Sequence, residues 1–225
     1  MKDVLISIRP QWVEKIANGE KTIEIRKTKP KLETPFKCYI YCTIARKNGQ
    51  PLLVYKDGTV CFGDYRNACN CNANGEVDCY IGEGKVIGEF VCDKIDDIKP
   101  AYDFYSEIGY DLDDYQQKET CLTREELKNY GKGKPLFGWH ISNLKIYDKP
   151  KELSNFSQKC KYAKYQDDDW YDSWFCGNEY VECDWQDCPS CGGESCGYED
   201  YAYCMCNGLK PLTRPPQSWC YVEGE

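Results

Sequence analysis

The distribution of cysteine constrains this fold more than any other feature of the sequence. The chain has 225 residues and 17 cysteines, nine of which lie in residues 160–225, where no long apolar periodicity is present. Such a segment cannot bury enough apolar surface to form a core by itself. It is expected to be cross-linked by metal, to pack its aromatic side chains onto the rest of the protein, or to stay partly disordered.

Zinc is the expected cross-link. The odd number of cysteines argues against a secreted disulfide framework, as does a first apolar run too short for a signal peptide. A cytoplasmic protein with thiolate-bound metal is favoured. The spacing Cys183-x₄-Cys188-x₂-Cys191-x₄-Cys196 contains the C-x₂-C pair typical of such sites. Because this region has no histidine, the expected site is an all-thiolate, structural Zn²⁺ site.

The other cysteines leave alternatives open. Cys204 and Cys206 can replace two of these four ligands. An earlier insertion, residues 45–84, has a palindromic cysteine spacing that suits a second metal, with the candidate ligands Cys61, Cys69, Cys71 and Cys79. The competing interpretation of both clusters is a set of reduced thiols.

Charge divides the chain along its length. Its 29 Lys and Arg residues and 37 Asp and Glu residues give a net charge of −8. Residues 1–50 nevertheless hold 11 basic and 5 acidic residues, whereas residues 160–225 hold 4 and 13. A basic surface suits a phosphate-bearing partner, and an acidic tail repels nucleic acid unless it folds away from that surface. The alternative is a solvated charged surface without a partner.

Composition limits the class of protein. The chain is 41% hydrophobic with a mean hydropathy of −0.71, and it has no apolar run of the roughly 20 residues that a membrane helix needs. We expect a soluble α+β protein with one large or two small domains and no membrane partner. A Gly-rich phosphate loop, a His-Glu-x-x-His motif and the His-x-Glu of nucleobase deaminases are all absent.

The N-terminal residues carry clear signals for where helices and strands begin and end. The sequence predicts a strand over residues 4–8 and a helix that begins at Pro10 and stops at Gly19. It also predicts a strand over 21–26, in which apolar and polar residues alternate. Further strands are predicted over 38–43, 85–92 and 136–147, and a helix over 122–131. Thr123 and Glu126 form a capping box for that helix, and Gly131 is its expected stop.

The strand 21–26 carries the candidate site. Its alternation predicts that Ile23 and Ile25 face the core, while Thr22, Glu24 and Arg26 line the opposite face.

The spacing Gly19, Lys21, Glu24 and Arg26 resembles the signature of the ASCH domain family. Residues 84–95 and 138–142 extend the resemblance, so that it covers about 1–148. It implies a small PUA-like β-barrel with flanking helices and a cleft that contains the motif. The remaining residues, 149–225, resemble the variable extension of some bacterial and phage members.

The resemblance implies binding of RNA or a modified nucleoside. Gly19 would let the chain turn sharply, Lys21 and Arg26 would offer two cations to phosphate or to a base carbonyl, and Glu24 would join them in the cleft. The alternative is that Arg26 pairs with Glu24 on one face of the strand and Lys21 is merely solvated.

Two enzymatic alternatives remain open. Related N4-acetylcytidine amidohydrolases use a Thr three residues after the Lys, but here that position is Glu24, and Thr22 could replace it only in another register. A ribonuclease could use Glu24 as base between the two cations. His140, the single histidine, is more typical of a packed strand residue than of a catalyst.

A third alternative is a protein-interaction adaptor. Acidic and aromatic residues alternate over 167–175 in the acidic tail. They could bind a protein, dock on the basic cleft, or fill a small core of their own.

Overall fold

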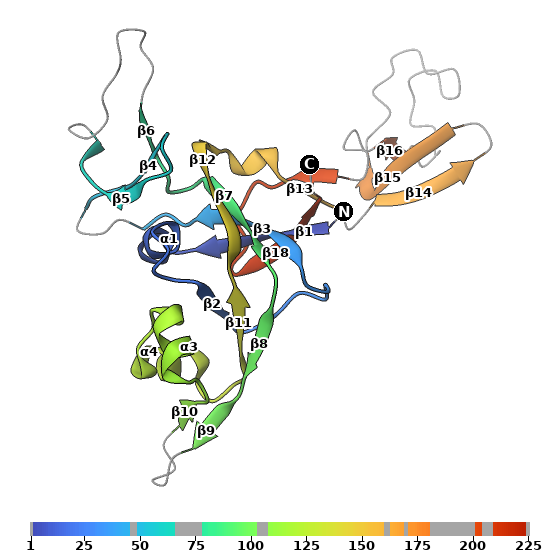
Figure 1. Cartoon of the computed structure of the whole chain (residues 1–225). Helices are drawn as coiled ribbons and strands as arrows, with labels where there is room; N and C mark the ends of the chain where they lie inside the picture. Colours follow the sequence, from blue (N-terminus) through green and yellow to red (C-terminus); the bar gives the residue numbers. More distant parts are fainter. Residues whose placement is uncertain are drawn as a thin grey trace, which may run out of the picture. The chain divides into compact units, whose positions relative to one another are not determined.

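The computed structural model describes residues 2–45, 49–65, 78–102, 108–159, 163–168, 171–180, 201–203 and 209–223. The chain forms two compact units (Figure 1). One contains Met1–Asn155 and Thr213–Glu225, and the other contains Phe156–Leu212. The chain therefore leaves the first unit and returns to it at its C-terminal end. The expected extension 149–225 is divided between the two units.

A five-stranded sheet belongs to the first unit, in the order β12-β7-β3-β1-β18. Its strands are β1 (Lys2–Ile8), β3 (Phe36–Cys42), β7 (Val86–Cys92), β12 (Ser142–Lys151) and β18 (Trp219–Glu223). Strands β1 and β3 are parallel, and the other neighbours are antiparallel. A parallel pair needs a long crossover connection, which here contains α1 and β2.

The last strand of the chain pairs with the first. Val4 lies opposite Tyr221, and Ile6 lies opposite Trp219. This pairing gives β1 a neighbour on both edges, and Val4, Leu5 and Ile6 have no exposed surface. Nothing local in the sequence predicts it, because the paired residues are more than two hundred positions apart.

Helix α1 (Pro10–Ala17) forms as predicted. Pro10 is its first residue, where the missing N–H costs no hydrogen bond, and Val13 and Ile16 are buried at i, i+3 spacing. Asn18 caps the helix, and Gly19 follows at φ +73°. That left-handed conformation turns the chain toward β2, and glycine adopts it without steric cost.

The first unit also contains a three-stranded sheet, in the order β2-β11-β8. It contains β2 (Ile23–Arg26), β8 (Ile95–Ile98) and β11 (Leu136–His140). Ile23 and Ile25 are buried in an apolar cluster with Ile98, Leu127 and Leu136, which confirms the predicted core face of β2.

The predicted strand 136–147 divides into β11 and β12, which belong to different sheets (Figure 1). Ile141 lies between them, where its N–H donates to Thr22 O, and Asn143 has φ +49°. The described strands form separate hydrogen-bonded sheets, so the closed barrel that the resemblance implied is not formed among them. The break after β11 is the physical reason, since the chain changes sheets there.

Two short helices, α3 (Asp114–Thr120) and α4 (Arg124–Gly131), precede β11. The predicted capping box of α4 is confirmed, because Thr123 Oγ1 accepts from the Glu126 N–H and the Glu126 carboxylate accepts from the Thr123 N–H. The left-handed C-terminal residue is Lys132, one position beyond the predicted Gly131. Gly131 instead lies against the Tyr110 side chain, where a Cβ would clash.

Four smaller β-sheets are also present among the described residues. In the first unit, β4 (Leu52–Tyr55) pairs with β5 (Val60–Phe62) and β6 (Cys79–Ile81), and β9 (Pro100–Tyr102) pairs with β10 (Ile108–Tyr110). In the second unit the strands are β13 (Ser157–Lys159) with β17 (Leu209–Pro211), and β14 (Ala163–Asp168) with β15 (Tyr171–Tyr180) and β16 (Tyr201–Tyr203). In the part of the chain that is described, no helix is long and apolar enough to cross a membrane.

Candidate functional site

A cavity of about 760 Å³ lies in the first unit. Its lining comes from five segments that are distant in sequence: the end of β1 with the start of α1, β2 with the residues on either side of it, the residue after β3, helix α4 with the residues just before it, and the residues just before β18. Four basic and two acidic side chains contribute to the lining. The cavity is therefore locally basic in a chain that is acidic overall.

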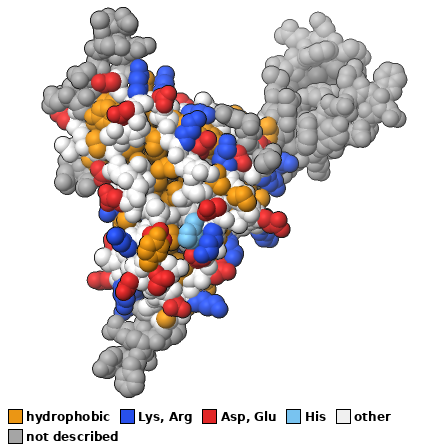
Figure 2. All heavy atoms as spheres, in the orientation of Figure 1, with side chains coloured by type: hydrophobic (Ala, Val, Ile, Leu, Met, Phe, Trp, Pro, Cys, Tyr) orange, Lys and Arg blue, Asp and Glu red, His pale blue; other side chains and the backbone are white. Residues whose placement is uncertain are grey.

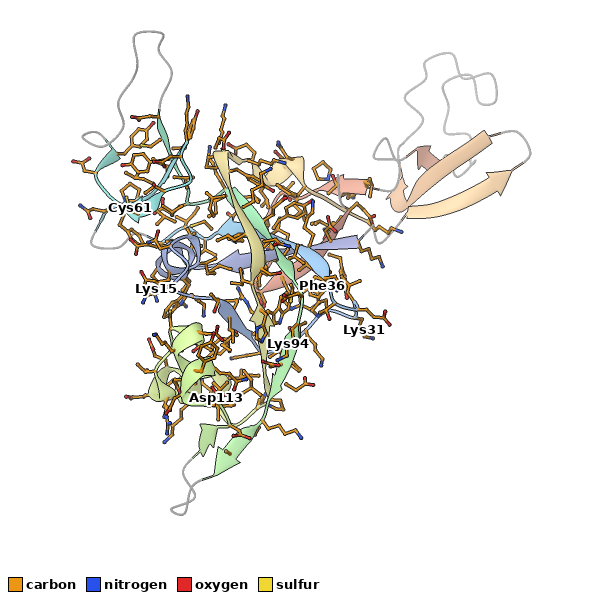
Figure 3. All side chains as sticks on the ribbon, in the orientation of Figure 1. Lys15, Lys31, Phe36, Cys61, Lys94 and Asp113 are labelled. Atoms are coloured by element: carbon orange, nitrogen blue, oxygen red, sulfur yellow. The ribbon has the colours of Figure 1, made fainter. Side chains whose placement is uncertain are left out.

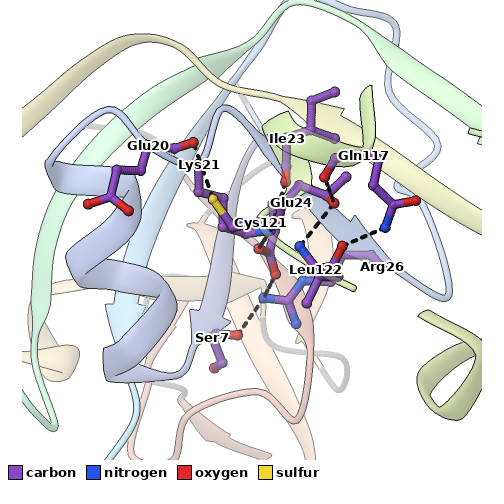
Figure 4. A network of polar contacts seen from close by, with 10 residues as sticks. Ser7, Glu20, Lys21, Ile23, Glu24, Arg26, Gln117, Cys121 and Leu122 are labelled. Carbon is purple, nitrogen blue, oxygen red and sulfur yellow. Dashed lines mark hydrogen bonds and ion pairs between the residues drawn. The ribbon is translucent and has the colours of Figure 1, made fainter. Parts of the chain in front are cut away.

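A buried carboxylate in the cavity wall lies between two cations (Figure 4). Glu24 Oε1 is 3.1 Å from Arg26 Nη2, and Glu24 Oε2 is 3.4 Å from Lys21 Nζ. All three residues line the cavity and are less than a tenth exposed. The predicted face of β2 thus carries Glu24 and Arg26 into the cavity.

Lys21 is fixed entirely by protein groups. Its ammonium donates to Ile23 O at 2.8 Å and to Thr120 O at 2.6 Å, in addition to its contact with Glu24. These three acceptors match the three N–H bonds of an ammonium group. Burial lowers the pKa of Lys21, and the Glu24 carboxylate opposes that shift. Lys21 is therefore buried and not solvated, and its ammonium ties β2 to the end of α3.

Arg26 retains donor capacity. Its Nη2 donates to Ser7 O at 2.6 Å, while its buried Nε has no hydrogen-bond partner. An unpaired buried donor of this kind costs roughly 1–3 kcal/mol. The alternative in which Arg26 pairs with Glu24 along the strand is confirmed, but the pair lies in the cavity wall and not on a solvated face.

Aromatic and exposed basic side chains complete the cavity. Trp12 and Tyr130 line it, and Lys21 Nζ lies 5.4 Å from the Trp12 ring centroid. Burial raises the pKa of the Tyr130 phenol; Arg26 acts in the opposite direction. Arg9 and Lys27 are exposed, and Lys27 Nζ lies 4.7 Å from the centroid of the Tyr130 ring.

The C-terminal segment supplies a wall that sequence reasoning missed. Gln217 and Ser218 line the cavity. They are held there because the Ser7 N–H donates to Ser218 O at 2.8 Å and Ser7 Oγ donates to Pro216 O at 2.7 Å. Gln217 and Ser218 are thus part of the site. The only sequence signal near them is the short apolar strand that follows, β18.

Two other candidates from the sequence lie outside the cavity lining. Gly19 is exposed at the end of α1, where it sets the direction of β2. Thr22, the conceivable displaced nucleophile, has a buried hydroxyl without a hydrogen-bond partner and does not line the cavity.

His140 lies on β11, half-buried, and its Nε2 is 2.8 Å from Asp96 Oδ2. It is visible on the face drawn in Figure 2, where acidic and basic side chains surround it. Lys94 Nζ lies 2.8 Å from the other oxygen of Asp96. Burial raises the pKa of Asp96, but the hydrogen bonds from Lys94 and His140 outweigh that effect and leave it lowered. His140 does not line the cavity.

The expected zinc ligands Cys183, Cys188, Cys191 and Cys196 lie outside the described residues. In the insertion, Cys79 is disulfide-bonded and Cys61 is a free thiol, so a four-thiolate site there would require this disulfide to be reduced. The described residues contain no group of three or more His, Cys, Asp or Glu side chains that could hold a metal. The acidic segment 167–175 lies in the second unit, and its side chains are outside the description.

Comparison with known proteins gives structural matches only. The structure matches the crystal structure of ASCH from Zymomonas mobilis with 17% sequence identity and a TM-score of 0.40, over 67% of this chain and 73% of that chain. Two point mutants of that protein match with the same identity and TM-score, over 68% and 67% of this chain and 77% and 74% of theirs. These structures carry the name of the family that the Gly19–Arg26 motif resembles. No protein-family model and no curated protein matches the sequence.

Proposed function

We propose that the cavity binds a nucleobase, as part of RNA or of a modified nucleoside. The observation that carries this proposal is the buried Glu24 carboxylate, fixed between Lys21 and Arg26 in the wall of a 760 Å³ cavity. Small-molecule sites of about 300–1,000 Å³ commonly combine apolar walls with a few fixed polar groups.

The polar pair Glu24 and Arg26 suits the edge of a base. Each oxygen of the Glu24 carboxylate forms an ion pair with one protein cation, and its remaining lone pairs can accept a hydrogen bond from a ring or exocyclic N–H of a base. Arg26 can donate to an adjacent carbonyl or ring nitrogen, because its guanidinium has five N–H bonds and is not fully used by protein acceptors. A base presents such donors and acceptors side by side.

The aromatic residues suit the face of a base. Stacking on an aromatic side chain contributes about 1–3 kcal/mol per base, and the cavity lining offers both Trp12 and Tyr130. Arg9 and Lys27 are exposed at the same cavity and can neutralise a phosphate attached to the base. In this assignment Lys21 acts indirectly, by holding Glu24 in place.

The test is direct binding of the four ribonucleoside monophosphates and N4-acetylcytidine to the full chain, measured by calorimetry. We expect at least one to bind, and Arg9→Gln to weaken nucleotides more than the uncharged nucleoside. Lys145→Gln is the matched control, because Lys145 is an exposed cation on β12 outside the cavity lining. Failure of every probe to bind would remove the proposal. Release of cleavage products from RNA in the same samples would favour the ribonuclease alternative.

A further inference from the structure

The loop that leaves the cavity carries a regular row of cations. After β2 the sequence reads Lys27-Thr28-Lys29-Pro30-Lys31. All three lysines are exposed, whereas Pro30 is buried. The lysines recur at two-residue intervals in the sequence, and Lys29, which precedes the proline, is restricted to extended conformations. Two residues of extended chain span about 6–7 Å.

This loop is held in place by the C-terminal strand. Trp219 Nε1 donates to Thr28 Oγ1 at 3.0 Å, and the Lys31 N–H donates to the Tyr221 hydroxyl at 2.7 Å. Lys31 lies on the outside of the first unit, on the connection between β2 and β3 (Figure 3). The loop is therefore anchored on both sides of Pro30 by side chains of β18, while all three lysines are exposed.

The row begins at the cavity itself, because Lys27 is one of the lining residues. Lys29 is paired with Asp97 at 2.8 Å, and both side chains are substantially exposed. An exposed pair of this kind contributes about 1 kcal/mol or less, so a phosphate can displace the carboxylate. The first acidic residue along the loop is Glu33, two positions beyond the last lysine.

We propose that Lys27, Lys29 and Lys31 form a track for successive phosphates of a single-stranded nucleic acid whose base occupies the cavity. This inference rests on the proposed function and narrows it: the ligand is a polynucleotide chain and not a free nucleoside. The spacing of the lysines is of the same order as the spacing of phosphates in a stretched strand. The track supplies affinity and direction, and the cavity supplies discrimination between bases.

The experiment compares the full chain with the double variant Lys29→Gln/Lys31→Gln, which leaves every cavity-lining residue intact. The probes are uridine monophosphate and mixed-sequence RNA of about twelve nucleotides, the length a single-strand site commonly covers. Each phosphate contact contributes about 0.7 to the salt slope on single strands, or about fivefold in affinity at roughly 0.1 M salt. We therefore expect the double variant to bind RNA with about 25-fold lower affinity, and the slope of log affinity against log salt concentration to fall by about 1.4. The affinity for the mononucleotide should not change.

The outcomes separate this inference from the proposed function. Equal binding of RNA and mononucleotide, with no effect of the double variant, would overturn the track and leave the cavity's function standing. An equal loss in the control double variant Lys145→Gln/Lys149→Gln, which removes two exposed lysines elsewhere, would also overturn it. Binding of neither probe would instead remove the proposed function. A DNA oligomer of the same sequence should lose as much affinity as RNA in the track variant; an unequal loss would contradict recognition through phosphates alone.

Discussion

At the scale of single residues, the site depends on a buried triad of charges. Lys21, Glu24 and Arg26 would each be costly to bury alone, and together they neutralise most of that cost. The carbonyl groups of Ile23 and Thr120 accept hydrogen bonds from Lys21, and the carbonyl group of Ser7 accepts one from Arg26. Glu24 is the member that both cations share.

Replacing Glu24 by Gln should therefore destabilise the protein by about 3 kcal/mol, because two buried cations lose their counter-charge. Urea unfolding of the two proteins measures this difference. Glu126→Gln is the matched control: Glu126 also lines the cavity but is exposed, and Gln can still complete the capping box. Equal stabilities of Glu24→Gln and Glu126→Gln would contradict the account of the triad.

The stability of the fold is expected to depend on pH through Asp96. Its lowered pKa means that the folded state favours the carboxylate, so its stabilisation is complete above the unfolded value of about 3.9 and is lost as pH falls through the folded pKa. Asp96→Asn should cost about 1 kcal/mol at neutral pH, and the difference should shrink below about pH 4. Thermal unfolding at several pH values provides the measurement. A difference that stays constant down to acid pH would show that the charge of Asp96 is not responsible.

At the scale of elements, β18 links the sheet to the site. Its Trp219 side chain lies 6.0 Å from Trp139 and 5.4 Å from Tyr221, measured between ring centroids, and its indole N–H bonds Thr28. The residues just before it form a wall of the cavity. The same strand thus completes the edge of the sheet and anchors the lysine loop.

Trp219→Ala should lower the free energy of unfolding by about 2–3 kcal/mol, less than a fully buried Trp, because Trp219 is half-buried. It should also weaken binding at the cavity. Trp219→Phe is the control, since it retains ring packing and loses only the hydrogen bond. Calorimetry of the folded variants gives both quantities. Full binding by a folded Trp219→Ala variant would refute the coupling between strand and cavity.

Gly131→Ala tests a packing contact that opposes helix propensity. Alanine is the better helix former by about 1 kcal/mol, but its Cβ would collide with the Tyr110 side chain. We expect a net loss of about 1–3 kcal/mol. Chemical denaturation should show that Tyr110→Phe recovers part of the loss in the double variant, because the hydroxyl is the nearest atom. A stabilising Gly131→Ala would indicate that the helix end simply shifts.

For the molecule as a whole, the division of the chain into two units is the relevant feature. In the sequence, residues 156–212, which form one unit, separate the two segments that make up the other unit. A fragment that ends near residue 150 would lack β18 and the Gln217–Ser218 wall of the cavity. Binding experiments therefore require the full chain.

The cysteine-rich unit is expected to contain a structural zinc ion. We predict about one Zn²⁺ per chain by atomic emission, and a lower content in Cys191→Ser, because a tetrahedral site needs all four thiolates. Cys61→Ser, which removes a free thiol of the first unit, should keep the metal. A purified chain without bound zinc would remove this expectation.

The local elements could be predicted from the sequence. Pro10 and Gly19 set the limits of α1, the alternation over 21–26 separated the core face of β2 from the cavity face, and Thr123 with Glu126 began α4. Each depends on residues within a few positions of one another, so the pattern is visible in the chain.

The remaining features depend on contacts between residues that are distant in the sequence. The sequence predicts Lys21 as a cation of the site, and the folded chain adds the carbonyl of Thr120, 99 positions away, as an acceptor for its ammonium. The C-terminal segment became a wall of the cavity through a hydrogen bond from Ser7, 209 positions away. Strand 136–147 divided where the two sheets separate. Contacts over such separations leave no periodic trace in a single sequence, because the free energy that selects them arises from burial and hydrogen bonding in the folded chain.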